Sequence, residues 1–139
     1  PDFRIVVMPV NINNTHWVLC IVDFVNKEVL FIDSMAGSGT MYRETLLRWV
    51  QDEHHNKKGA PLDPSVKWTS RATGSSLPQQ MNGSDCGAFA TMCAVYFSDP
   101  FGGAGGGFGG LGISADFSQR DIPYFRKRML VDIVNMNID

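Results

Sequence analysis

The spacing of apolar residues changes along this chain and predicts an α+β fold. The runs near the start are strand-like, and the second of them, residues 16–24, is apolar at nearly every position, so both of its faces should be covered. A short turn at residues 26–28 makes the second and third runs an antiparallel hairpin. We expect the first strand to end at Pro9, because proline cannot donate a ladder hydrogen bond. The predicted strands are residues 4–9, 16–24, 29–34 and 66–70.

From Thr40 the apolar residues take a helical spacing, which predicts an amphipathic helix that runs to about Asn56. A shorter helix is expected at residues 87–97, where apolar positions suit burial against the sheet. The last helix should begin near Phe117, with Pro123 in its first turn, and run to Met136. Together these elements predict a small antiparallel or mixed sheet that is flanked by helices.

Composition narrows the class of protein. The 139 residues are 44% hydrophobic and 19% charged, which suits one domain over residues 1–139 with a core of its own. The net charge of −2 gives no reason to expect nucleic acid as a partner. No apolar run is long enough for membrane insertion. The three cysteines, Cys20, Cys86 and Cys93, lack the density of a disulfide framework, and we expect Cys93 to be buried in the core.

Residues 101–112 are rich in glycine, with eight glycines in twelve positions, and predict an insertion loop over residues 101–115. A phosphate-binding loop is a poor explanation, because the loose glycine pattern at 105–110 has no Lys-Ser/Thr and no strand-to-helix context. The basic residues 126–128 are flanked by apolar positions, so we expect them to form a solvated helix face rather than a nucleic-acid patch.

Residues 79–90 carry the strongest candidate chemistry. They predict an Asn-Gly turn, a polar cap at Ser84 or Asp85, and a helix with Cys86 in its first turn. A thiol at that position lies at the positive end of the helix dipole, which favours the thiolate. Gln80 lies six residues earlier and could supply a side-chain amide beside the sulfur. This combination suggests acyl transfer by a cysteine nucleophile, although a lone cysteine is more often a small buried apolar residue.

A base for Cys86 is available on the predicted hairpin. His16 opens the second strand and Asp33 closes the third, and in an antiparallel hairpin these two ends lie side by side. Asp33 can then accept from one imidazole nitrogen and leave the other to face the sulfur. Asp33 is the last residue of the run VLFID, and burying a carboxylate at the end of an apolar strand costs free energy unless it has a partner.

These residues carry a resemblance to a known family. The pair His16-Trp17, the FIDS segment that ends at Ser34, the segment PQQMNGSDCG at 78–87 and PYFRKRM at 123–129 resemble the SUMO-specific (sentrin-specific) cysteine proteases of the ubiquitin-like-protein protease family. The resemblance covers nearly the whole chain outside the glycine-rich insert. It implies a papain-like cysteine protease fold with its order permuted.

The resemblance also implies roles for individual residues. His16 would be the general base, Asp33 the residue that orients it, and Cys86 the nucleophile. Gln80, with the backbone N–H near Cys86, would form the oxyanion hole, and Trp17 would bind substrate by walling the tunnel over the Gly-Gly tail. The implied reaction is hydrolysis after the C-terminal Gly-Gly of SUMO, both in precursors and in SUMO-conjugated proteins. It needs no metal and no organic cofactor.

The sequence is also compatible with other functions. The modifier could be another ubiquitin-like protein such as NEDD8, or the substrate a viral-type polyprotein. The chain could also be a non-catalytic fragment that binds a ubiquitin-like protein. We expect a monomer that lacks the family's N-terminal portion, which supplies much of the SUMO-binding surface. The resemblance implies a nuclear location, with the nuclear envelope or cytoplasm as alternatives.

Overall fold

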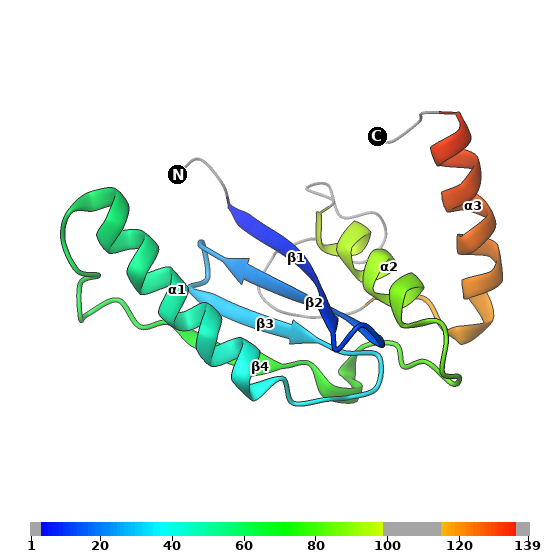
Figure 1. Cartoon of the computed structure of the whole chain (residues 1–139), viewed down its shortest axis with the longest axis horizontal. Helices are drawn as coiled ribbons and strands as arrows, with labels where there is room; N and C mark the ends of the chain where they lie inside the picture. The colour runs from blue at the N-terminus through cyan, green and yellow to red at the C-terminus, as the bar shows by residue number, and fades with distance from the viewer. Residues whose placement is uncertain (1–3, 99–114, 136–139) are drawn as a thin grey trace.

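The computed structural model describes residues 4–98 and 115–135 (Figure 1). The predicted helix end at Met136 and residues 101–114 of the predicted insertion loop lie outside these ranges. In chain order the elements are β1 (Ile5–Ile12), β2 (His16–Asp23), β3 (Glu28–Ile32), α1 (Thr40–Lys58), β4 (Thr69–Ala72), the short 3₁₀ helix η1 (Gly74–Ser76), α2 (Cys86–Ser98), the 3₁₀ helix η2 (Gln119–Asp121) and α3 (Ile122–Val134).

The strands form one mixed sheet in the order β1-β2-β3-β4. The first three strands are antiparallel, and the register places Leu19 of β2 between Pro9 of β1 and Ile32 of β3. β4 returns after α1 and pairs with β3 in parallel. The predicted hairpin of the second and third strands is confirmed, and the fold class is α+β.

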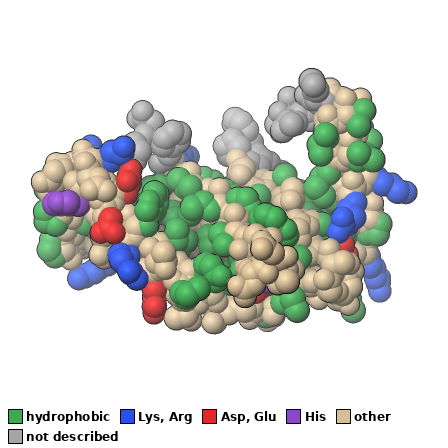
Figure 2. Space-filling model, viewed as in Figure 1, with side chains coloured by type: hydrophobic (Ala, Val, Ile, Leu, Met, Phe, Trp, Pro, Cys, Tyr) green, Lys and Arg blue, Asp and Glu red, His purple; other side chains and the backbone are tan. Residues whose placement is uncertain are grey.

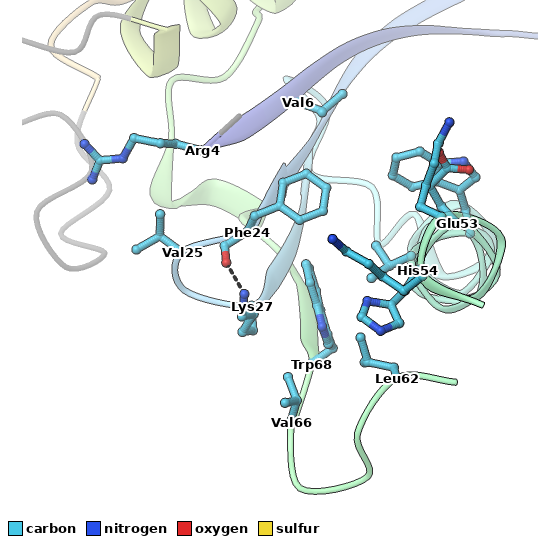
Figure 3. Close-up of a pocket in the computed structure, with 14 residues that line it drawn as sticks. Arg4, Val6, Phe24, Val25, Lys27, Glu53, His54, Leu62, Val66 and Trp68 are labelled. Carbon is cyan, nitrogen blue, oxygen red and sulfur yellow. Dashed lines mark hydrogen bonds and ion pairs between the residues drawn. The ribbon is translucent and has the colours of Figure 1, made fainter. Parts of the chain in front are cut away.

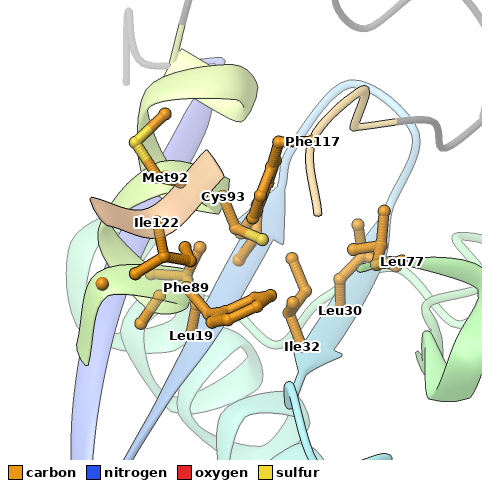
Figure 4. Packing of buried hydrophobic residues seen from close by; sticks show 12 residues of the cluster. Leu19, Leu30, Ile32, Leu77, Phe89, Met92, Cys93, Phe117 and Ile122 are labelled. Carbon is orange, nitrogen blue, oxygen red and sulfur yellow. The ribbon is translucent and has the colours of Figure 1, made fainter. Parts of the chain in front are cut away.

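Helices cover both faces of the sheet, which explains why β2 is apolar at successive positions (Figure 1). One face packs against α1, where Val22 and Val29 contact Val50. The other face packs against α2 and the start of α3, with Leu19 and Ile32 in the same cluster as Phe89 (Figure 4). Cys93 is 2% exposed in this second cluster, as predicted.

The first strand does not end at Pro9. β1 continues to Ile12, and Pro9 lies opposite Leu19 in the ladder. Among the described residues β1 pairs only with β2, so it is an edge strand. An edge strand tolerates proline because the missing N–H can fall on the unpaired side.

Other boundaries also differ from the predictions: β3 ends at Ile32 rather than Ser34, and α3 begins at Ile122, after η2, rather than near Phe117. The strand predicted at residues 66–70 lies at Thr69–Ala72, because a turn closed by Val66 N–H on the Asp63 carbonyl at 2.9 Å occupies the preceding residues. Helix α1 runs to Lys58 rather than Asn56. Gly59 ends it in the left-handed region at φ 69°, with its N–H on the carbonyl of His55.

Helix α3 packs on the core along one side, through Ile122, Phe125 and Met129. Ile122 is 1% exposed, whereas other apolar side chains such as Leu130 and Val134 are 62% and 71% exposed. Figure 2 shows apolar side chains on the surface of this helix. The described residues therefore leave an apolar face on this helix uncovered. None of the described helices is both long and apolar enough to cross a membrane.

Candidate active site

His16 and Asp33 meet at one end of the β2–β3 hairpin. His16 is the first residue of β2, and Asp33 directly follows β3. Nε2 of the imidazole donates to Oδ1 of Asp33 at 2.7 Å. Because Nε2 is taken by the carboxylate, Nδ1 is the ring nitrogen left for another partner.

The Asp33 carboxylate is fixed from the other side by its own loop. Its Oδ1 accepts the Met35 backbone N–H at 2.8 Å, and its Oδ2 accepts the Gly37 backbone N–H at 3.2 Å. The residue is 7% exposed. The carboxylate that follows an apolar strand therefore has the partners that its burial requires.

Cys86 is the first residue of α2, where the helix dipole favours a negative charge. Asp85 occupies the cap position, because its carbonyl accepts the Phe89 N–H at 3.0 Å. Its side chain does not cap the helix by the usual hydrogen bond and is instead bound by groups from elsewhere in the fold. The prediction that the nucleophile lies at a helix start is in agreement with this geometry.

The surroundings of Cys86 favour its thiolate. Burial alone would raise the pKa of the thiol, but the Trp17 backbone N–H and the His16 ring hydrogen-bond to the sulfur. Together with the Gly87 backbone N–H they outweigh burial, so the pKa of Cys86 lies below its ordinary value of 9.0. A lowered thiol pKa is typical of a reactive cysteine.

The His16 pKa moves in the opposite direction. Burial alone would lower it, but the hydrogen bond to Asp33, and after it the hydrogen bond to Cys86, raise the pKa above 6.5. The imidazole is thus joined to a carboxylate on one side and to a thiol on the other. A raised histidine pKa beside a lowered cysteine pKa favours an imidazolium–thiolate pair.

The other two cysteines lack such partners. Burial raises the pKa of Cys20 to about 11 and that of Cys93 to about 12. Neither thiol forms a disulfide. The described part of the chain therefore has a single cysteine whose surroundings suit a nucleophile.

Trp17 lies beside the start of α2. Its side chain is 43% exposed, and a Cβ added to Gly87 would lie 3.6 Å from Cδ1 of the indole. The ring therefore faces the backbone next to Cys86 with room for no more than a small side chain between them, while part of it faces solvent. This position is compatible with the predicted contact to substrate.

Gln80 is held in the loop before Cys86. Its backbone N–H donates to the Ser34 carbonyl at 2.9 Å, and its Oε1 accepts the Ser34 hydroxyl at 2.5 Å. Its Nε2 donates to the Asn82 carbonyl at 2.5 Å. The structure assigns it no hydrogen bond to Cys86 among the described contacts. One N–H of the amide remains available for a ligand, because an amide NH₂ carries two donors.

Sequence reasoning missed three residues whose side chains hold the loops of this site in place. Ser34 ties the end of β3 to Gln80, and Gln119 contacts the loop before Cys86. Arg126 lies on a solvated face, as expected, with 53% of its side chain exposed, and its guanidinium also forms an ion pair with Asp85 at 2.6 Å. Its only sequence signal was the position of an arginine in the PYFRKRM motif, which says nothing about its partner.

A groove of about 1010 Å³ lies at the other end of the β2–β3 hairpin and contains none of the predicted site residues (Figure 3). Phe24, Lys27 and Trp68 line it together with the C-terminal half of α1. In residues 4–98 and 115–135, no group of three or more His, Cys, Asp or Glu side chains is placed to hold a metal ion.

His16 lies between Asp33 and Cys86, as the predicted triad requires, and comparison with known proteins assigns the family. Residues 1–139 match the Ulp1 protease family, C-terminal catalytic domain, and the chain belongs to that family. It is 31% identical over 136 residues to human (Homo sapiens) sentrin-specific protease 2, covering 97% of this chain and 21% of that protein. It is 30% identical over 138 residues to ubiquitin-like-specific protease ESD4 of Arabidopsis thaliana, covering 99% of this chain and 25% of that protein.

Solved structures give the same fold. The C-terminal Ulp1 protease domain, determined in complex with Smt3, the yeast ortholog of SUMO, matches with a TM-score of 0.68 and 22% identity. That match covers 98% of this chain and 54% of the solved domain. The chain thus spans about half of that domain and about a fifth of the human protease. The expected α+β fold, a small mixed sheet flanked by helices, is therefore the fold of the Ulp1 protease domain.

Proposed function

We propose that this chain is the catalytic part of a SUMO-specific cysteine protease that hydrolyses the bond after the C-terminal Gly-Gly of SUMO. The observation that carries the proposal is the position of His16, which hydrogen-bonds to Asp33 on one side and to Cys86 on the other. The substrates are SUMO precursors and proteins that carry SUMO on a lysine. The protein acts as a monomer without a metal or an organic cofactor.

The mechanism uses Cys86 as the nucleophile. Its sulfur attacks the glycyl carbonyl carbon, a C–S bond forms, and the C–N bond to the leaving amine breaks. His16 donates the proton that the amine carries away, and Asp33 keeps the imidazole oriented. Water then attacks the thioester and gives one proton to His16, the C–S bond breaks with its electron pair on sulfur, and the imidazolium–thiolate pair is restored as the SUMO C-terminal carboxyl group leaves and ionises.

Two further residues act on the substrate. Gln80 donates its remaining amide N–H to the oxyanion, together with a backbone N–H near Cys86. The half-exposed Trp17 lies against the Gly-Gly tail, which has no side chains and can pass close to the indole. These roles are compatible with the observed positions of both residues in front of α2.

SUMO is favoured over other modifiers by the relatives. The similar human protein is named a sentrin-specific protease, and the similar solved domain was determined with the yeast ortholog of SUMO. The same triad would serve NEDD8 equally well, so the modifier depends on the surface that surrounds the site. A nuclear location goes with this proposal, and fluorescence microscopy of the tagged full protein tests it.

Hydrolysis of SUMO and NEDD8 that each carry a fluorogenic amide at the C-terminal glycine tests the proposal. We expect the chain to release the fluorophore from SUMO at least tenfold faster than from NEDD8, and Cys86→Ser to be inactive on both. Equal rates on the two modifiers would contradict the SUMO assignment. Binding of SUMO without any turnover by the unmutated chain would favour the non-catalytic reading.

A further inference from the structure

Helix α3 is attached to the loop that leads into Cys86 by an arginine–carboxylate contact. Arg126 donates through Nη2 to Oδ1 of Asp85 at 2.6 Å and through Nε to the same oxygen at 3.0 Å. Nη2 also lies 3.3 Å from the Ser84 carbonyl oxygen. One guanidinium from residue 126 therefore binds the two residues that directly precede the nucleophile.

Gln119 makes a second attachment to the same loop. Its Nε2 donates to Oδ2 of Asp85 at 2.7 Å, and its Oε1 accepts the Met81 backbone N–H at 2.8 Å. The amide thus spans the loop from its first residue to its last. Gln119 is itself fixed at the start of η2, where Ser118 and Asp121 form a capping box.

The loop also carries an internal brace. Asn82 accepts the backbone N–H groups of Ser84 and Asp85 through Oδ1, each at 3.1 Å, and donates through Nδ2 to Oδ2 of Asp85 at 2.7 Å. The Asp85 carboxylate is therefore bound by Asn82, Gln119 and Arg126 together. Such a network of charge-assisted hydrogen bonds defines a single position for the carboxylate.

The charge of Asp85 matters because the carboxylate belongs to the residue next to Cys86. An unpaired anion there would oppose formation of the thiolate, whereas an arginine that is bound to it offsets that effect. The charged group that contacts the sulfur is His16 from β2, with Asp33 behind it, while Arg126 from α3 is bound to the carboxylate of Asp85, the residue before Cys86. The hydrogen bonds from Asn82, Arg126 and Gln119 lower the pKa of Asp85, so it is ionised at neutral pH.

We infer that Arg126 and Gln119 are positioning residues for the nucleophile. They hold the loop at residues 81–85 in place and neutralise Asp85, so that Cys86 begins α2 facing His16 with its thiolate favoured. This inference rests on the proposed function, because it assumes that Cys86 reacts as a thiolate. A purely structural role for the two residues would change stability and leave the reactivity of the folded protein unchanged.

The test is the rate at which iodoacetamide alkylates Cys86 between pH 5 and 9, followed by mass spectrometry. The variants are Arg126→Ala, Arg126→Lys, Gln119→Ala and Gln119→Glu, each shown to be folded by circular dichroism. Matched controls are Lys127→Ala and Arg120→Ala, which remove neighbouring cations whose side chains form no hydrogen bond or ion pair with this loop in the described part of the chain. The assay needs no modifier protein and so does not depend on the identity of the substrate.

We expect Arg126→Ala to shift the profile to higher pH by about one unit, which lowers the rate near pH 6 by about tenfold. Arg126→Lys should recover part of the loss, because it restores the charge without the paired hydrogen bonds. Gln119→Glu should have a larger effect than Gln119→Ala, because a second carboxylate repels Asp85. The two control variants should follow the unmutated protein.

The outcomes separate this inference from the proposed function. Unchanged profiles in folded Arg126→Ala and Gln119→Glu would overturn the inference, while reactive Cys86 in the unmutated protein would leave the proposed function standing. If Cys86 of the unmutated protein reacted no faster than Cys20 and Cys93, the proposed function itself would fail. If Arg126→Ala did not fold, the two Gln119 variants would decide the question.

Discussion

Ser34 and Gln80 are joined twice across 46 residues of sequence. The Ser34 hydroxyl donates to Oε1 of Gln80 at 2.5 Å, and the Ser34 carbonyl accepts the Gln80 backbone N–H at 2.9 Å. Ser34 directly follows Asp33, the partner of His16. The two hydrogen bonds therefore join the loop after β3 to the loop that carries Gln80, the predicted oxyanion donor. The hydrogen bond to Oε1 also orients the amide so that its NH₂ group donates one N–H to the Asn82 carbonyl and keeps the other for a ligand.

Loss of the hydroxyl should therefore weaken catalysis. We predict that Ser34→Ala lowers kcat by about tenfold, and that Gln80→Ala lowers it by about 10²- to 10³-fold, as removal of an oxyanion donor does. KM should change less than kcat, because the donor acts in the transition state. Steady-state kinetics on a SUMO fluorogenic substrate measure both. An equal loss in Ser34→Ala and Gln80→Ala would mean that Ser34 has another role.

The missing side chain at Gly37 leaves the space that the Asp33 carboxylate occupies. A Cβ at position 37 would lie 2.4 Å from Oδ2 of Asp33, so Gly37→Ala must displace the carboxylate from its backbone donor and from His16. We predict a loss of about 10²-fold in kcat/KM with only a small fall in Tm. Ser38→Ala, in the same loop, removes only an exposed 3.3 Å contact to Thr40 and should retain full activity. A Gly37→Ala variant as active as Ser38→Ala would contradict the assigned geometry.

The raised His16 pKa depends first on Asp33 among its favourable contacts. In Asp33→Asn the burial of the ring becomes dominant, so the His16 pKa should fall toward or below 6.5. NMR titration of the imidazole resonances, assigned with a His16→Gln variant, measures the shift. A His16 pKa that stays above 6.5 in Asp33→Asn would show that another group holds the charge.

The same raised pKa links stability to pH. The folded protein binds the His16 proton more tightly than the unfolded chain does. The contribution of this proton to the free energy of unfolding is therefore fully present below pH 6.5, and it is lost as the pH rises through the His16 pKa of the folded protein. The free energy of unfolding of the unmutated protein should therefore exceed that of His16→Gln by more at pH 6 than at pH 9. Urea titrations at the two pH values measure this difference, and a larger difference at pH 9 would contradict the direction of the shift.

An ion pair with a buried carboxylate and a partly exposed arginine joins β3 to β4. Arg71 Nε donates to Oε1 of Glu28 at 2.7 Å, and the Glu28 side chain is only 7% exposed. We predict that Arg71→Met destabilises the fold by about 3 kcal/mol, because it leaves a buried carboxylate without its partner. Lys57→Ala, which removes an exposed pair to Glu53, should cost less than about 0.5 kcal/mol. Urea unfolding compares the two, and similar losses would contradict the account of Glu28.

The pattern of apolar residues was sufficient to predict the hairpin and the proximity of its ends. Because strands 16–24 and 29–34 are separated by a short turn, only an antiparallel register is possible, and it places His16 beside Asp33. The helix that begins at Cys86 was predictable from its polar cap and the apolar positions that follow.

Long-range contacts were not predictable in the same way. The parallel pairing of β4 with β3 depends on how α1 crosses the sheet, and β4 has no strong alternation to mark its start. Gln119 and Arg126 reach Asp85 from 34 and 41 residues away, and a single sequence contains no signal for such pairs. Pro9 was misjudged because its local effect is to end a strand, whereas an edge position tolerates it.

We propose that Cys86 is the nucleophile of a SUMO-specific protease. The most direct measurement is covalent labelling by SUMO that carries an electrophile at its C-terminal glycine, beside the corresponding NEDD8 probe and a Cys86→Ser control. We predict that the SUMO probe labels the unmutated chain, that mass spectrometry places the adduct on Cys86, and that neither NEDD8 nor Cys86→Ser reacts. Labelling that persists in Cys86→Ser, or that is as efficient with NEDD8, would contradict this account.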